Sequence, residues 1–198
     1  MATRDTGAEE NIKEAAKRIF FVEGKLNATT QDIANEAGVN RTLLNYYFRT
    51  REALFDQVYK EALSALSQKM DEVFKAELPF RQKVENIIEV FLEDIITYPF
   101  KEIFLISEIN SEHAEIKKSN EPENPVFRNF AIEVEEAMKR GEVNRIKDPY
   151  HFIINLFSLM AYPVIIRPLN EKLLNFTKEE YDEILKNRKS EIINLLLN

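Results

Sequence analysis

The chain has 198 residues, of which 44% are hydrophobic and 31% charged, and its formal net charge is −7; these values are ordinary for a globular protein able to bury a core. It contains no cysteine, which excludes a disulfide framework, a thiolate nucleophile and a cysteine-bound metal. The N-terminal sequence lacks the apolar run of a signal peptide and no stretch reaches the ~18–20 apolar residues of a membrane span, so we expect a cytoplasmic protein.

The charge is unevenly distributed along the chain. Residues 1–60 hold nine basic and nine acidic side chains, so the whole net charge of −7 belongs to residues 61–198. The fifteen residues from Ala37 to Arg51 contain three arginines and no carboxylate. A neutral N-terminal part with one basic stretch is compatible with DNA binding, whereas the acidic remainder is repelled by DNA.

The first predicted helix spans residues 9–23. Its apolar residues recur at helical spacing on one face, namely Ile12, Ala15, Ala16, Ile19 and Phe20. Gly24 follows as a residue that can end a helix in the left-handed conformation. Two shorter helical patterns flank Gly38, and they supply apolar residues such as Leu44 and Phe48 that can pack against the first helix. We expect a three-helix unit of about fifty residues.

The two short helices and their turn have the pattern of a helix-turn-helix. Thr29 or Thr30 can cap the second helix, whose free N–H groups form a potential phosphate site. Gly38 supplies the permissive backbone of the turn. Asn40 can cap the third helix, so the residues after it form an exposed first turn of the kind that enters the major groove.

The third helix carries side chains suited to reading base edges. Arg41 can donate two hydrogen bonds to guanine, Thr42 can contact several bases, and Leu43 can pack on a thymine methyl group. Asn45 can pair with adenine or donate to a phosphate. These residue types predict direct readout of a DNA sequence.

Helix-turn-helix spacing also occurs in plain helical bundles, so the spacing alone does not establish DNA binding. An ordinary solvated helix mixes its charges, whereas this one lacks carboxylates and ends with Tyr46 and Tyr47, whose hydroxyls can reach the DNA backbone. The chemistry therefore favours DNA binding. The alternative is a helical protein-interaction module that has lost operator binding, and acidic residues at 41–47, which are absent, would have favoured it.

The run from Thr29 to Leu54 resembles the DNA-binding signature of TetR-type transcriptional regulators. The matching residues are Thr29-Thr30, Ile33-Ala34, Ala37-Gly38-Val39, Tyr46-Tyr47-Phe48, Arg49 with Arg51, and Glu52-Ala53-Leu54. The sequence departs from the family pattern at Asn40, Thr42 and Asn45. Because the last two lie on the reading surface, the resemblance does not extend to the operator sequence.

The resemblance implies a homodimeric repressor that releases a pseudo-palindromic double-stranded DNA operator when a small molecule enters its body. It also implies which residues contact DNA: Thr30, Gln31, Arg41, Thr42, Leu43, Asn45, Tyr46, Tyr47 and Arg51. The family pattern assigns the phosphate contacts mainly to the threonine, the two tyrosines and the last arginine of this set. Repression, rather than activation, is the expectation for the family.

A long fourth helix is predicted from Thr50 to about Ala76, with one face apolar along its length. At ~25 residues it is ~37 Å long, enough to connect the N-terminal unit rigidly to the rest of the chain. We therefore expect this helix to transmit a signal between the two parts.

Three further helices are predicted, beginning after Pro79, near Phe100 and at Asn124-Pro125, with a polar loop at 112–124 before the last. Five aromatic residues on them are candidates to line a ligand cavity: Phe91, Phe100, Phe104, Phe127 and Phe130. Such a cavity favours a small hydrophobic or aromatic effector. Aromatic residues at helical spacing also commonly form an ordinary core, so both interpretations stay open.

The C-terminal part is predicted to form two strongly apolar helices. One spans Pro149 to Arg167, with a kink expected at Pro163, and the other starts at the capping box of Thr177 and Glu180. Both show more apolar surface than one body can cover. Two such helices from each of two chains would make a four-helix bundle, the usual dimer of this family, whereas the alternative is a monomer with an apolar hairpin. A two-fold reader with half-sites ~34 Å apart favours the homodimer.

The sequence thus predicts an all-α protein of about nine helices, with a DNA-binding helix-turn-helix domain at residues 1–50 and a ligand-binding and dimerisation domain at 51–198. The two histidines, His113 and His151, have no second His, Cys or carboxylate at ligand spacing, so we expect no metal site. Four glycines in the whole chain leave no Gly-rich phosphate loop. We therefore expect no enzyme activity, no cofactor and no membrane partner.

Overall fold

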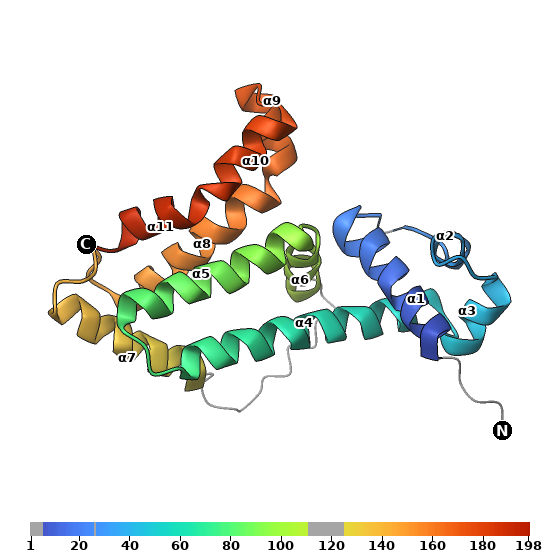
Figure 1. Ribbon diagram of the computed structural model, residues 1–198, viewed down its shortest axis with the longest axis horizontal. Coiled ribbons are helices and arrows are strands. Elements are labelled where there is room, and N and C mark those ends of the chain that lie inside the picture. Colours follow the sequence, from blue (N-terminus) through green and yellow to red (C-terminus); the bar gives the residue numbers. More distant parts are fainter. Residues whose placement is uncertain (1–5, 26, 111–124) are drawn as a thin grey trace.

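The computed structural model describes residues 6–25, 27–110 and 125–198, and in these ranges the chain is all-helical, which confirms the predicted class (Figure 1). The β-type pairing there is limited to an isolated bridge between Val143 and Leu197. In chain order the elements are α1 (Thr6–Lys17), the π-helix η1 (Arg18–Val22), α2 (Thr30–Glu36), α3 (Arg41–Tyr47), α4 (Arg51–Lys75), α5 (Phe80–Thr97), α6 (Lys101–Asn110), α7 (Pro125–Lys139), α8 (Pro149–Ile165), α9 (Arg167–Leu174), α10 (Lys178–Lys186) and α11 (Arg188–Leu196).

The first predicted helix is observed as α1 followed by η1. The N–H of Glu23 donates to the carbonyl of Arg18, five residues earlier, at 3.0 Å, so the last turn is wider than an α-helical one. Three consecutive residues, Ile19, Phe20 and Phe21, are buried in this turn. It contacts α6, so it joins the N-terminal helices to the helices that follow α4.

Helices α1 to α3 form an N-terminal unit with its own hydrophobic core (Figure 1). Leu44 and Phe48 are buried in it, as the sequence predicted, together with Ile33 from α2. The first half of α4 contributes Leu54 and Val58 to the same core. The N-terminal unit is therefore packed onto the helix that leaves it.

Helices α5 to α11 form the body, and α4 joins the body to the N-terminal unit as one continuous helix of 25 residues (Figure 1). The second half of α4 places Met70 and Phe74 in the body core. That core also takes buried residues from α5, α7, α8, α10 and α11. The predicted connecting helix is thus observed, with Thr50 capping its start by accepting the N–H of Ala53.

Helix α8 continues through Pro163 and ends at Ile165, after which α9 leaves at an angle of 69°. Pro163 has no N–H, so the carbonyl of Leu159 loses its helical donor, and Arg188 Nε on α11 donates to that oxygen at 2.9 Å. The predicted interruption therefore falls just beyond the proline, because a side chain from a neighbouring helix satisfies the freed carbonyl. No single helix in the described ranges is long and apolar enough to cross a membrane, and the α8–α9 pair meets that test only as a bent pair, by length and composition.

The prediction of about nine helices is too low, since the described ranges hold twelve helical elements. The first predicted helix divides into α1 and η1, and the last divides at Asn187 into α10 and α11. Helix α9 was not predicted, because the predicted helix ends at Arg167, whereas Pro168 lies in the first turn of a new helix. The capping box of Thr177 and Glu180 is present at the start of α10.

Candidate nucleic-acid interface

Helix α2 begins at a reciprocal capping box. The N–H of Asp32 donates to Thr29 Oγ1 at 3.2 Å, and the N–H of Thr29 donates to Asp32 Oδ2 at 2.8 Å. The hydrogen bond from the Thr29 backbone holds the pKa of the Asp32 carboxyl below its usual value. This carboxylate already occupies part of the helix N-terminus, so the potential phosphate site is reduced to the first-turn N–H groups of Thr30 and Gln31.

The turn between α2 and α3 depends on Gly38, which has φ of 66°. Its N–H donates to the carbonyl of Asn35 at 3.2 Å, and the N–H of Val39 donates to that of Ala34 at 2.9 Å. Nothing lies within 4 Å of the position of a Cβ at Gly38, so the glycine is required for its backbone and not for close packing. The turn sets the angle between α2 and α3.

Helix α3 presents one face to solvent and one to the core. Asn40 caps it, with Oδ1 accepting the N–H of Leu43 at 2.8 Å. Arg41, Thr42 and Asn45 are exposed on the outer face, and Leu43 is half-buried at its edge. The side chains that the sequence analysis proposes for base reading therefore lie on or beside the outer face of α3, which has no acidic residue in its first turn.

The two tyrosines at the end of α3 differ in their surroundings. Tyr46 is 67% exposed, whereas Tyr47 is half-buried against the core of the N-terminal unit. Their rings meet edge to face, with centroids 5.3 Å apart. The packed ring of Tyr47 supports the exposed ring of Tyr46 at the rim of the outer face.

The residues of α2 assigned to the interface are less exposed to a partner. Thr30 is half-buried, and Gln31 is exposed but donates from Nε2 to Asn35 Oδ1 at 2.8 Å. On the side of α2 that faces η1, Glu36 pairs with Arg18 at 2.8 Å. A hollow of about 850 Å³ on that side is lined by the carboxylates of Glu23, Asp32 and Glu36 and by one lysine, Lys25, which pairs with Glu23. Its excess of acidic groups makes it unsuited to a phosphate.

Arg51 lies differently from what the resemblance implied. Its Nε donates to the backbone carbonyl of Ala28 at 2.7 Å, and its guanidinium lies over the ring of Phe20, 5.1 Å from the centroid. Only 27% of its side chain is exposed. Arg51 therefore braces the first residue of α4 against the segment that leads into α2, a role that the sequence did not suggest.

The body contacts the N-terminal unit directly at the start of α6. The N–H of Phe100 donates to the carbonyl of Phe21 at 3.0 Å, and the Phe100 ring lies against Gly24. Next to it, Lys101 is fully buried and forms an ion pair with Asp94, its ammonium lying 5.8 Å from the centre of the Tyr98 ring. Together with α4, this junction gives the body two points of attachment to the N-terminal unit.

Four of the five aromatic residues proposed for a ligand cavity are divided between the two hydrophobic cores. Phe104 is buried in the core of the N-terminal unit and Phe100 packs against that core. Phe91 and Phe130 are buried in the body core, and Phe127 on α7 is 38% exposed. Helical spacing could not separate these groups, because it gives the face of each helix but not which core that face meets.

Near Phe127, rings that the sequence analysis did not single out fill the space between α4, α7 and α8. Phe74 lies 5.6 Å from Phe127 and 5.1 Å from Phe130, and Phe157 lies 5.9 Å from Phe127, measured between ring centroids. These contacts form a packed aromatic cluster. It ends at a hollow of about 740 Å³ between the end of α4 and the start of α7.

Lys83 lines this hollow and is 4% exposed. Its ammonium donates to the carbonyl of Phe74, in the last turn of α4, at 3.0 Å and pairs with Glu133 at 2.7 Å. Lysine is seldom so buried unless it is paired. Lys83 lies one residue before Val84 and four before Ile87, on the apolar face of α5. This position in the sequence was the signal that could have predicted its burial.

No metal site is apparent in the described part of the chain, where no group of three or more His, Cys, Asp or Glu residues is placed to hold an ion. His151 is exposed in the first turn of α8, and its N–H donates to the capping carboxylate of Asp148 at 3.1 Å. His113 lies outside the described residues.

Comparison with known proteins relates this geometry to a family. Residues 12–58 match the family model described as bacterial regulatory proteins, tetR family. The chain is 29% identical over 139 residues to an uncharacterized HTH-type transcriptional regulator, YhgD of Bacillus subtilis strain 168, and the alignment covers 67% of this chain and 70% of the relative.

Solved structures share the whole fold. A TetR-family transcriptional regulator from Haemophilus influenzae superposes with a TM-score of 0.56 at 16% identity and covers 98% of both chains. The ketosteroid transcriptional regulator KstR2 of Mycobacterium tuberculosis has a TM-score of 0.68 at 12% identity, covering 99% of this chain and 97% of that one. HlyIIR, a hemolysin II transcriptional regulator, has a TM-score of 0.61 at 24% identity and covers 99% of each.

Proposed function

We propose that this chain is a TetR-family transcriptional regulator, a repressor that binds a pseudo-palindromic operator through its helix-turn-helix as a homodimer and releases it on binding a small molecule. The observation that carries the proposal is the outer face of α3. Arg41, Thr42 and Asn45 are exposed there around a buried Leu44, on a helix without a carboxylate. Residues 1–50 form the DNA-binding domain in this proposal, and residues 51–198 the regulatory one.

The residues of the interface have different roles in this proposal. Arg41 contacts guanine, Thr42 and Asn45 contact bases in the same groove, and Leu43 packs on a thymine methyl group. The hydroxyls of Thr30, Tyr46 and Tyr47 and the amide of Gln31 hold phosphates. Arg51 acts mainly as a positioning residue, because two of its contacts are made to the N-terminal unit itself.

Dimerisation is proposed through α8 and the helices that follow it. Helix α8 contains no Asp, Glu, Lys or Arg in its 17 residues, yet Ile154 is 59% and Tyr162 61% exposed. On α11, Leu195 is 53% exposed. An uncharged face suits a two-fold interface, where residues near the axis meet their own copies and a charge would repel itself.

The effector is proposed to be a small hydrophobic or aromatic molecule bound in the body. The hollow at the end of α4 supports this, because Phe74, Leu78 and Val126 give it apolar walls while Lys83 and Glu133 offer polar groups. Lys83 donates to the last turn of α4, so a ligand that displaces it acts directly on the connecting helix. We propose no enzymatic activity, and we place the protein in the cytoplasm with the chromosome.

The test is binding of the purified protein to its own upstream intergenic DNA at two salt concentrations, with Arg41→Ala compared to wild type. Loss of a bidentate base contact is expected to weaken selective binding by about 1–3 kcal/mol, or ~5- to 150-fold. Arg81→Ala is the matched control, because Arg81 is an exposed arginine on α5 that pairs with Glu85.

Two results would argue against the proposal. Absence of selective, salt-sensitive binding to any DNA by the wild type would favour the protein-interaction alternative, since phosphate contacts impose a steep salt dependence and protein docking does not. Equal loss of affinity in the Arg41→Ala and Arg81→Ala proteins would show that the α3 face is not the reading surface.

A further inference from the structure

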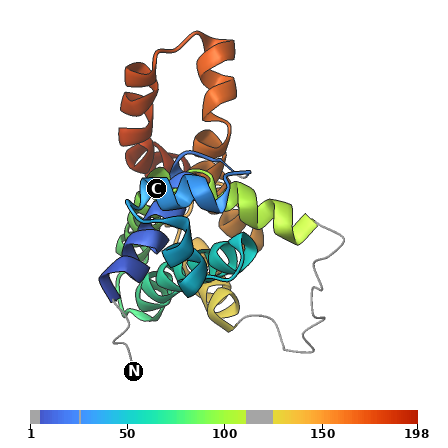
Figure 2. The same ribbon diagram turned by 90° about the vertical axis from the view of Figure 1, so that its right-hand side faces the viewer.

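Among the body helices that the structure describes, α9 alone buries none of its residues. Leu169 is 52%, Leu173 70% and Leu174 60% exposed. Together with α10 it forms a hairpin, the α9–α10 arm, that stands out from the rest of the molecule (Figure 2). Three exposed leucines on one short helix form an apolar patch of a kind that monomeric proteins seldom expose to water.

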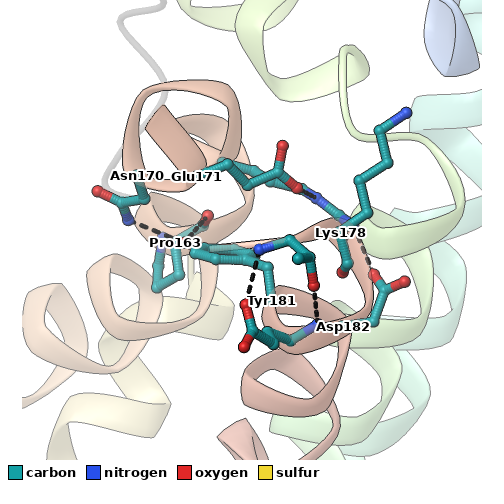
Figure 3. Close-up of polar contacts among 9 residues, drawn as sticks. Pro163, Asn170, Glu171, Lys178, Tyr181 and Asp182 are labelled. Atoms are coloured by element: carbon teal, nitrogen blue, oxygen red, sulfur yellow. Dashed lines mark hydrogen bonds and ion pairs between the residues drawn. The ribbon is translucent and has the colours of Figure 1, made fainter. Parts of the chain in front are cut away.

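The arm is held rigidly by a polar cluster at its base (Figure 3). Arg167 donates from Nε to Glu171 at 2.7 Å, pairs through Nη1 with Asp182 at 2.7 Å, and donates from Nη2 to the carbonyl of Lys178 at 3.1 Å. Its guanidinium also lies 5.6 Å from the centre of the Tyr181 ring. One side chain thus ties the start of α9 to the start of α10.

Tyr181 adds a second tie, to the end of α8. Its hydroxyl donates to the carbonyl of Pro163 at 2.9 Å and accepts from Asn170 Nδ2 at 2.8 Å (Figure 3). Tyr181 is itself 2% exposed. The direction of the arm is therefore fixed by buried and half-buried hydrogen bonds, so its leucines are presented in a defined position before any partner binds.

We propose that the α9 leucines pack against a second copy of this chain, so that each arm extends the contact made by α8 and α11 with the partner subunit. This inference rests on the proposed homodimer and adds to it an element that the sequence did not predict. The landing site is a hollow of about 490 Å³ that is lined by residues of α8 and α11 together with Ile146.

The distribution of charge favours a second copy over other partners. The hollow includes Asn155, Ser158 and Tyr162, and Arg188 is its one charged lining residue, with Nε already donating to Leu159. A face with a single charged side chain receives leucines at a smaller desolvation cost than a face rich in ion pairs. It is also continuous with the exposed Ile154 of the uncharged helix α8.

An anionic membrane or DNA fits the arm poorly. Residues 167–186 carry four basic and five acidic side chains, and the whole chain has a net charge of −7. Binding at an anionic lipid surface depends on basic residues next to the apolar ones, and here Lys172 is outnumbered by the carboxylates of α10.

The absence of cysteine from the chain allows a clean test with single cysteines. Leu173→Cys places a thiol on the arm, and Ser67→Cys places one on the exposed side of α4 as the matched control. The rate of thiol labelling by a bulky maleimide is measured over a range of protein concentrations, and sedimentation gives the oligomeric state at each. We expect labelling of Leu173→Cys to slow at least about tenfold as dimer forms, while Ser67→Cys stays unchanged.

A second pair of variants tests the energetic role of the arm. The double variant Leu169→Glu with Leu173→Glu is expected to raise the dimer dissociation constant roughly 10- to 100-fold, because these two leucines are buried only in the proposed dimer and glutamate cannot replace them there. Helix content and unfolding of the separated monomer should change little, because both side chains are exposed within one chain. Ser64→Glu with Ser67→Glu on α4 adds the same charge and is expected to leave the dissociation constant unchanged.

The outcomes separate this inference from the proposed dimer. A wild-type dimer in which Leu173→Cys is labelled as fast as in the monomer overturns the role of the arm and leaves the homodimer standing. A monomer at every concentration overturns both. If anionic phospholipid vesicles slow the labelling of Leu173→Cys and rising protein concentration does not, the arm binds a membrane. That result overturns the proposal that it binds a second copy.

Discussion

Gly24→Ala tests the junction between the body and the N-terminal unit. Gly24 has φ of 66°, and a Cβ at this position would lie 2.7 Å from Cδ1 and Cε1 of Phe100 and 2.9 Å from its Cγ. The left-handed backbone costs an alanine about 1–2 kcal/mol, and inserting a methyl group into a packed contact costs a further ~1–3 kcal/mol. We therefore expect the free energy of unfolding to fall by about 2–5 kcal/mol, out of the ~5–15 kcal/mol typical of a domain.

Two other glycines separate the backbone contribution from the clash. Gly38 and Gly141 have φ of 66° and 75°, and nothing lies within 4 Å of a Cβ at either position. Alanine there is expected to cost only the backbone term of about 1–2 kcal/mol. The assay is urea unfolding followed by circular dichroism, with the free energy in water compared at unchanged m-value.

A double-mutant cycle identifies Phe100 as the neighbour responsible. In a Phe100→Ala background the added methyl group meets no ring, so the cost of Gly24→Ala should fall to that of the two control glycines. Equal costs for Gly24→Ala and Gly38→Ala in the wild-type background would refute the reasoning. So would a coupling energy near zero between Gly24 and Phe100.

Three further predictions concern charged side chains that are partly or fully buried, those of Arg51, Lys83 and Glu102. Arg51→Lys should lower the free energy of unfolding by about 1 kcal/mol in urea titrations, because lysine keeps the charge but not the Nε donor to Ala28; no loss would favour a phosphate role. Lys83→Met should cost less than about 2 kcal/mol by the same assay, since Glu133 is 38% exposed and can be hydrated; a loss above ~3 kcal/mol would contradict this. Burial raises the pKa of the Glu102 carboxyl above 4.5, its value in the unfolded chain. The contribution of Glu102 to the free energy of unfolding is therefore fully present below pH 4.5 and is lost as the pH rises through the pKa of the folded state. Glu102→Gln should therefore raise stability at pH 8 but not at pH 4, and an equal effect at both would refute the shift.

Short-range interactions explain why much of the fold could be predicted. A cap joins residues two or three positions apart, so the caps at Asn40 and Thr177 follow from the local sequence, and both are observed. The inward face of α3 follows equally from helical periodicity, since Leu44 and Phe48 are four residues apart. The outer face of α3 is fixed by the same periodicity.

Long-range packing explains what could not be predicted. Arg51 has the same local sequence whether it contacts a phosphate or Ala28, and only the folded chain brings residues 23 positions apart within 2.7 Å. Phe100 and Phe104 contact the core of the N-terminal unit because α6 packs against η1. The spacing of apolar residues along one helix cannot predict which other helix it packs against.

The sequence by itself therefore determined the helical class, the helix-turn-helix and the residues on its outer face, because these depend on spacing within one helix or turn. The tertiary structure alone decided the inward contacts of Arg51, the division of the aromatic residues between two cores and the buried pair of Lys83. It also decided the direction of the α9–α10 arm, which depends on Arg167 and Tyr181 meeting groups 11 to 18 residues away. Such contacts depend on how whole helices pack, and that arrangement is a property of the folded chain and not of any local segment.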